Sequence, residues 1–134
     1  GRGEAVRQVE GIPPLSAVIV KPAVSLSTAA VYQACRPDPA RRGDADRLAV
    51  TLRRGLRSAI PLMHNALESP ARGLAPEVDR LLSDLRRAGG LHPLLTGSGS
   101  ACFAITRTVV EARHLAARME ALGWPAVFPV RLCA

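Results

Sequence analysis

A run of glycine and hydroxyl residues, Thr96–Ser100, lies between two short apolar segments and is the part of the chain best suited to chemistry. Gly97 and Gly99 let the backbone take positive φ and approach a ligand closely. Successive N–H groups in such a turn can form a concave site for a phosphate, beside the hydroxyls of Ser98 and Ser100. The residues therefore predict a phosphate-binding loop, although a tight turn that only joins two strands would use the same residue types.

Two better-known glycine motifs do not match this loop. It lacks the Gly-Lys-Ser/Thr ending of a P-loop, and no third glycine opens a helix as in a dinucleotide-binding fold. Any phosphate binding would therefore come from a loop between two strands.

Other kinds of site are poorly represented in the chain. The three cysteines are far apart and odd in number, which argues against a disulfide framework and for a reducing, cytoplasmic location. The three histidines lack the spacing of metal ligands, so we expect no metal site built from protein ligands alone. The apolar runs are too short to cross a membrane. The three cysteines are Cys35, Cys102 and Cys133, and the three histidines are His64, His92 and His114.

The net charge of +7 comes almost wholly from arginine, since Lys21 is the only lysine. A basic balance can indicate a nucleic-acid partner, but Arg47, Arg54 and Arg57 fall opposite the apolar stripe of a predicted helix, as on a solvated face. Aromatic residues make up only 3% of the chain, too few for a base-stacking platform. We therefore expect neither nucleic acid nor membrane as a partner.

The elements that must position the loop follow from periodicity and from helix-start signals. One helix is expected from Asp44 until Pro61 kinks or ends it, and a capping box at Thr108–Glu111 predicts another up to Leu122. The other expected elements are a strand over 17–20, a short helix over 29–35, a helix from Pro76 to Gly89–Gly90, a strand on each side of the loop, and an edge strand over 126–130. The order predicts one α+β domain over 1–134, a ferredoxin-like sandwich whose antiparallel four-stranded sheet carries its helices on one face.

Two further residues are candidates for contact with a substrate. Thr28, like Ser27 before it, is first of all suited to cap the short helix, and a substrate contact is the alternative. Asn65 lies with Glu68 where a helix gives way to a turn, and its side chain is suited to close that turn or to face a ligand. The sequence predicts no catalytic residue and no metal ligand in this chain.

Four segments together resemble the C-terminal domain of the GHMP superfamily of small-molecule kinases, over nearly the whole chain. The segments are Gly1–Glu4, Lys21–Tyr32, Asn65–Glu68 and Leu95–Phe103. The last is similar to the third motif that these kinases share. The Ser-Thr-x-x-Val-Tyr and Asn-x-Leu-Glu patterns point to the branch that phosphorylates 4-diphosphocytidyl-2-C-methyl-D-erythritol.

The resemblance implies an ATP-dependent kinase of non-mevalonate isoprenoid biosynthesis, which uses Mg²⁺ and phosphorylates the 2-hydroxyl of that substrate. It also implies that the ATP-binding and catalytic groups belong to an N-terminal domain, which would be this domain's partner. The fragment would then be inactive and bind no cofactor alone. Two alternatives stay open: another GHMP kinase, acting on homoserine or mevalonate, or a non-catalytic ferredoxin-like binding or regulatory module.

Overall fold

The computed structural model describes residues 10–36, 38–41 and 44–132. The Gly1–Glu4 segment and Cys133 lie outside the described residues. In chain order the elements are β1 (Leu15–Lys21), α1 (Thr28–Ala34), η1 (Pro39–Arg41), α2 (Asp44–Arg54), α3 (Leu56–Ala59), η2 (Ile60–Leu62), α4 (Glu68–Leu74), α5 (Pro76–Arg87), β2 (Leu91–Leu95), β3 (Cys102–Thr106), α6 (Val109–Ala121) and β4 (Ala126–Leu132).

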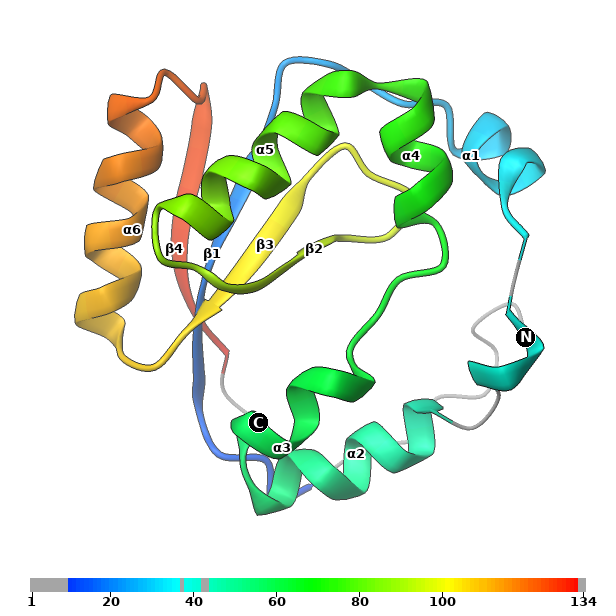
Figure 1. Cartoon of the computed structure of the whole chain (residues 1–134). Helices are drawn as coiled ribbons and strands as arrows, with labels where there is room; N and C mark the ends of the chain where they lie inside the picture. Colours follow the sequence, from blue (N-terminus) through cyan, green and yellow to red (C-terminus); the bar gives the residue numbers. More distant parts are fainter. Residues whose placement is uncertain (1–9, 37, 42–43, 133–134) are drawn as a thin grey trace.

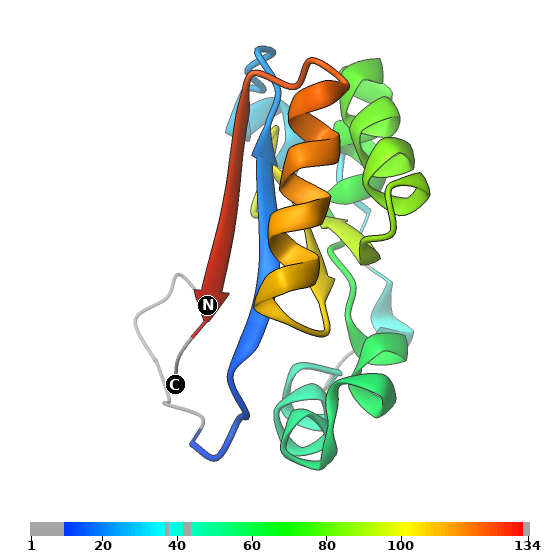
Figure 2. The same ribbon diagram turned by 90° about the vertical axis from the view of Figure 1, so that its left-hand side faces the viewer.

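The strands form one antiparallel sheet in the order β2-β3-β1-β4. This order, with helices between β1 and β2 and between β3 and β4, confirms the predicted ferredoxin-like arrangement (Figure 1). Helices α5 and α6 pack on one face of the sheet, and Figure 2 shows both on the same side of it. The predicted edge strand is confirmed as well, since β4 lies at the edge of the sheet. Pro129, which has no N–H to donate, is tolerated there because an edge strand has a neighbouring strand on one side only.

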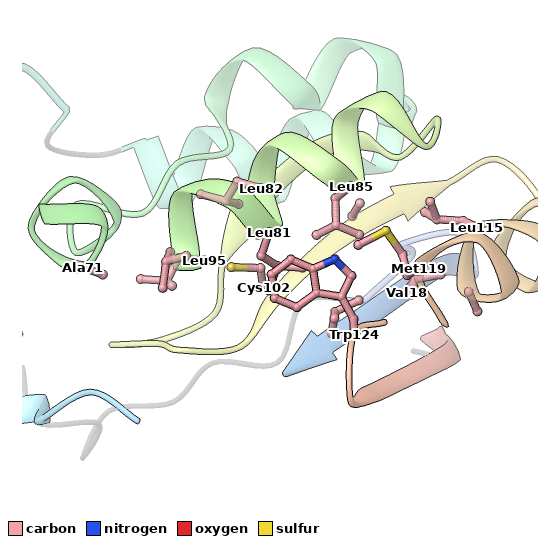
Figure 3. Close-up of a cluster of buried hydrophobic side chains, with 14 of the residues drawn as sticks. Val18, Ala71, Leu81, Leu82, Leu85, Leu95, Cys102, Leu115, Met119 and Trp124 are labelled. Carbon is pink, nitrogen blue, oxygen red and sulfur yellow. The ribbon is translucent and has the colours of Figure 1, made fainter. Parts of the chain in front are cut away.

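The core fills the space between that face and the two helices. Every second residue of β1 and β3 points into it, and α5 supplies Leu81, Leu82 and Leu85 at helical spacing. Trp124, just after α6, packs into the same cluster (Figure 3), and its indole N–H donates to Asp84 at 3.2 Å. The loop between β2 and β3 therefore starts from two strands that are fixed by a well-packed core.

The local helix-start signals act as their residue types predict. The Thr108 hydroxyl accepts from the Glu111 N–H at 3.0 Å, while the Glu111 carboxylate accepts from the Arg107 N–H at 2.9 Å. The Ser27 hydroxyl accepts from the Ala30 N–H at 3.3 Å, so Ser27 caps α1 and Thr28 is its first residue. The backbone N–H bond to Glu111 and the nearby Arg107 charge lower the pKa of this carboxyl below its ordinary value.

The structure differs from the sequence-based expectation over residues 44–74. The single helix expected from Asp44 ends instead at Arg54, because Gly55 takes φ +133° and starts a new turn that becomes α3. Pro61 lies within the 3₁₀ turn η2 that follows α3. The segment around Pro70, for which the sequence analysis predicts no helix, forms α4, where the proline falls in the first turn and removes no helical hydrogen bond.

Candidate functional site

The glycine-rich segment forms a closed turn at the end of the sheet where β2 gives way to β3. The Thr96 N–H donates to the Ala101 carbonyl at 2.9 Å, and the Gly99 N–H donates to the Thr96 carbonyl at 3.0 Å. Within the described residues, the N–H groups of Gly97 and Ser98 have no such partner. Gly97 is exposed and Ser98 is half-buried, so these two donors are available to an anion.

The two glycines of the loop differ in their surroundings. Gly97 has φ +57°, and a Cβ built on it would meet no atom within 4 Å. Gly99 has φ +88°, and a Cβ there would lie 2.9 Å from Leu95 Cδ1 and 3.1 Å from Leu26 Cδ1. Gly97 thus lies on the open side of the loop, where a ligand would approach, while Gly99 packs against the protein.

Asn65 holds the loop in place. Its side-chain amide donates to the Leu95 carbonyl at 2.9 Å and to the Gly97 carbonyl at 2.7 Å, and its oxygen accepts from the Leu67 N–H at 2.9 Å. Both amide hydrogens are therefore used within the protein. The structure gives Asn65 the turn-closing role considered from the sequence and adds a second role, in which it positions the loop.

Glu68 supports the same loop from the start of α4. Its carboxylate accepts from the Leu95 N–H at 3.0 Å, so Asn65 and Glu68 together bind both the N–H and the C=O of Leu95. Arg72 lies 3.9 Å from this carboxylate, one turn further along α4. The Asn-x-Leu-Glu segment is thus a support for the last residue of β2 and the turn that follows.

Thr28 meets the loop from the other side. Its hydroxyl lies 3.0 Å from the Ser98 hydroxyl, which joins the first residue of α1 to the middle of the loop. Tyr32 follows one turn later in α1, and 61% of its surface is exposed. The two hydroxyls and the free N–H groups form one polar cluster, in which Thr28 and Ser98 can donate to phosphate oxygens.

Ser100 lies in a different environment from the rest of the predicted set. It is buried, with 4% exposure, and its hydroxyl donates to the Val24 carbonyl. This bond ties the loop to the segment between β1 and α1. Ser100 is thereby placed as a structural support, and the groups that face outward belong to Thr96, Gly97 and Ser98.

Cys102, the first residue of β3, lies fully buried behind the loop. Burial raises the pKa of its thiol to about 12, and the negative charge of Glu68 adds to the increase.

We expect Cys102 to stay protonated and to resist alkylation in the native protein at about pH 8, while the half-buried Cys35 reacts faster. Since the folded pKa is above the ordinary 9.0, this thiol favours the folded state below pH 9 and loses that contribution as the pH rises towards 12. Mass spectrometry of alkylated peptides over time measures both rates, and equal rates would contradict the burial.

The hollows of the surface differ in the residues that line them. One hollow, of about 460 Å³, lies at the opposite end of the sheet between Leu15, Leu56 and Leu91 and is mainly apolar. A hollow of about 410 Å³ borders Asn65 and is lined by Arg36, Arg41 and His64 among others. Among the described residues, no cluster of histidine, cysteine or acidic side chains could hold a metal ion. No described helix is long and apolar enough to cross a membrane.

The residues that support the loop could be predicted only in part from the sequence. Asn65 and Glu68 stood out as turn residues, but both bind Leu95, which is 30 residues from Asn65 and 27 residues from Glu68 along the chain. The Thr28–Ser98 contact spans 70 residues. Neither contact was predicted from the sequence, because residue spacing along the chain does not report such distant pairs.

A family model described as the C-terminal part of GHMP kinases matches residues 40–123. The chain belongs to the GHMP kinase family. It is 37% identical to the 4-diphosphocytidyl-2-C-methyl-D-erythritol kinase of Rhodopirellula baltica, over 99% of this chain and 41% of that protein. The kinase of the same name from Pelotomaculum thermopropionicum is also 37% identical, over 88% of this chain and 42% of its own length.

Solved structures agree with this assignment. A crystal structure of 4-(cytidine 5'-diphospho)-2C-methyl-D-erythritol kinase matches all of this chain with a TM-score of 0.80 and 30% identity, over 48% of its own length. The L. major mevalonate kinase, at 18% identity and a TM-score of 0.71, shares the fold. The chain therefore spans about half the length of the GHMP kinases that it matches, and the fold is that of their C-terminal domain.

Proposed function

We propose that this chain is the C-terminal domain of a kinase that transfers the ATP γ-phosphoryl group to the 2-hydroxyl of 4-diphosphocytidyl-2-C-methyl-D-erythritol. The loop Thr96–Ser100 would bind phosphate oxygens from this domain's side of the active site. The catalytic groups would come from an N-terminal domain outside this chain, and the protein would act in the cytoplasm as part of non-mevalonate isoprenoid biosynthesis.

The loop's free donors carry the proposal. The N–H groups of Gly97 and Ser98 have no partner within the described residues, although Asn65 and Glu68 hold the strand end before them in a fixed position. Phosphoryl transfer depends mainly on positioning and on stabilising the charge that spreads over the transferred group. Donors fixed in advance stabilise that charge without reorganising during the reaction.

The choice of substrate is supported by the relatives. The two kinases of that name are each 37% identical over most of this chain, whereas the mevalonate kinase and a homoserine kinase from Cytophaga hutchinsonii, at 18% and 19% identity, support the fold alone. The Asn65–Glu68 segment, which points to this branch in the sequence, is also the segment that supports the loop.

The donor set of the loop suits phosphate and not a cation. Thr28, Thr96 and Ser98 offer hydroxyls beside backbone N–H groups, and the Glu68 carboxylate, which supports the loop, accepts from the Leu95 N–H. Mg²⁺ prefers carboxylate and phosphate oxygens, so we propose that the N-terminal domain and the nucleotide hold it. Mg²⁺ would neutralise phosphate charge there, and this domain's part would be to bind and orient.

The test is an ATP-dependent phosphorylation assay with the full-length protein. Supplied separately with 4-diphosphocytidyl-2-C-methyl-D-erythritol, homoserine and mevalonate, the protein is expected to turn over the first substrate alone, and the 1–134 chain none. Turnover of homoserine or mevalonate would keep the kinase and overturn the substrate. Absence of turnover with all three would favour the binding-module alternative.

A further inference from the structure

A hollow of about 460 Å³ lies at the end of the sheet opposite the Thr96–Ser100 loop, and we call it the basal hollow. Antiparallel pairing brings the start of β1, the start of β2 and the end of β3 together at this end. Leu15 and Leu91 line the hollow from the strands, and Leu56 and Ile60 line it from α3 and η2. Its volume falls within the range of small-molecule sites, about 300–1,000 Å³.

The apolar walls of the basal hollow face each other without closing. Helix α3 packs mainly on α2 and η2, and Figure 1 shows α2 and α3 near the start of β1, apart from α5 and α6. The four aliphatic side chains that line the hollow, Leu15, Leu56, Ile60 and Leu91, are all only partly buried. Apolar surface is thus left in contact with water at one place, and an apolar group that covered it would gain free energy from its burial.

Two arginines border the same hollow and make it positive. Arg57, on α3, has no hydrogen-bond or ion-pair partner within the described residues. Arg107, just after β3, donates to Glu111 through Nη1 at 3.2 Å, which leaves its second Nη group for another acceptor. None of the described aspartates and glutamates lines the hollow. Because guanidinium groups donate well-aligned hydrogen bonds to phosphates and carboxylates, the hollow favours an anion.

We propose that the basal hollow binds a small amphipathic anion, a molecule with an aliphatic chain and a phosphate or carboxylate head group. The chain would lie between Leu56 and Leu91, and the head group would bind Arg57 and Arg107. This inference does not depend on the proposed reaction, because no residue of the Thr96–Ser100 loop lines the hollow.

Simpler ligands use only half of the lining. An uncharged apolar molecule would cover the aliphatic walls and leave Arg57 without a partner. An inorganic anion would pair with the arginines and leave the aliphatic walls in contact with water. An amphipathic anion satisfies both parts at once, and the hollow has room for a single short chain.

The experiment measures the binding of octyl phosphate to the full-length protein by isothermal titration calorimetry, below the concentration at which this probe forms micelles. Octanoate replaces the phosphate by a carboxylate on a chain of similar length. Inorganic phosphate tests the head group alone, and octanol tests the chain alone. R57A and R107A each remove one of the two charges. R113A is the matched control, because Arg113 is exposed on α6 and does not line the hollow.

We expect octyl phosphate, octanoate or both to bind at least about tenfold more tightly than inorganic phosphate and octanol, since each of the latter uses one half of the lining. R57A and R107A should each weaken that binding by about tenfold, and R113A by less than about twofold. The soluble probe with the higher affinity identifies the head group. If circular dichroism shows that one of the two variants is unfolded, the other provides the comparison.

Binding that R57A and R107A leave unchanged would place the probe elsewhere on the protein and overturn the proposal. An affinity for inorganic phosphate or octanol equal to that for octyl phosphate would overturn it as well, because one half of the lining would then have no part in binding. The proposal would also be wrong if neither soluble probe bound, even if the protein bound vesicles of phosphatidylglycerol, since a membrane surface would then be the ligand.

Discussion

Replacement of Gly97 by valine is expected to lower kcat/KM of the full-length kinase by about 10²-fold or more, the effect of losing a fixed donor at a charged transition state. Gly97 has φ +57° and its Cβ would extend into open space, next to its own N–H group, which has no partner within the described residues. A branched side chain there blocks the close approach of a phosphate. The backbone strain of a branched residue at this φ costs about 1–3 kcal/mol, so the protein should still fold.

Gly123→Val is the matched control. Gly123 lies in the turn between α6 and β4 and has φ +85°, and a Cβ at this position would likewise meet no atom within 4 Å. It should suffer a similar loss of thermal stability with normal turnover. If Gly97→Val retains turnover to the same degree, the loop is only a connection between strands. Gly99→Val is a poorer test, because its side chain would collide with Leu95 and Leu26 and change the fold of the loop as well.

Replacement of Leu81 by alanine is expected to lower the free energy of unfolding of this domain by about 2–5 kcal/mol. Leu81 is fully buried on α5 and packs in the cluster that includes Cys102 and Trp124 (Figure 3). Shortening the side chain removes apolar contacts and leaves a cavity that close-packed neighbours fill only in part. Urea unfolding of the chain, followed by circular dichroism, measures the change.

Leu122→Ala makes the same chemical change at a side chain that is 58% exposed. It should alter the free energy of unfolding by no more than about 0.5 kcal/mol. If Leu81→Ala lowers the free energy of unfolding as little as Leu122→Ala does, the packing of α5 against the sheet would be contradicted.

The features that the sequence predicted best depend on residues close together in the chain. The capping box of Thr108 and Glu111 spans a single helical turn, and the apolar stripe of α5 repeats within it. The order of strands and helices was enough for the ferredoxin-like sheet because short connections allow few arrangements. The break at Gly55 was missed, since the apolar spacing continues across it and a glycine within such a pattern does not by itself end a helix.

Some features of the candidate site could likewise be predicted from the sequence, and others depend on the tertiary structure. The residue types of Thr96–Ser100 indicated a phosphate-binding loop, because glycine conformation and hydroxyl donors are properties of the residues themselves. Which of these residues face outward was decided by the tertiary structure, which buries the Ser100 hydroxyl against Val24 and gives the Gly97 and Ser98 N–H groups no partner among the described residues. Asn65 took its positioning role only when folding brought it beside Leu95 and Gly97.

The sequence by itself determined the domain type, the order of strands and helices along the chain and the place of the loop, since these follow from local conformational preference and from the periodic burial of apolar side chains. Only the tertiary structure decided how the loop is supported and which of its groups face outward. The physical reason is that hydrogen bonds between Asn65 and Gly97 or between Thr28 and Ser98 join residues 32 and 70 positions apart. Such contacts form when the packed core brings distant segments together, and no spacing along the chain records them.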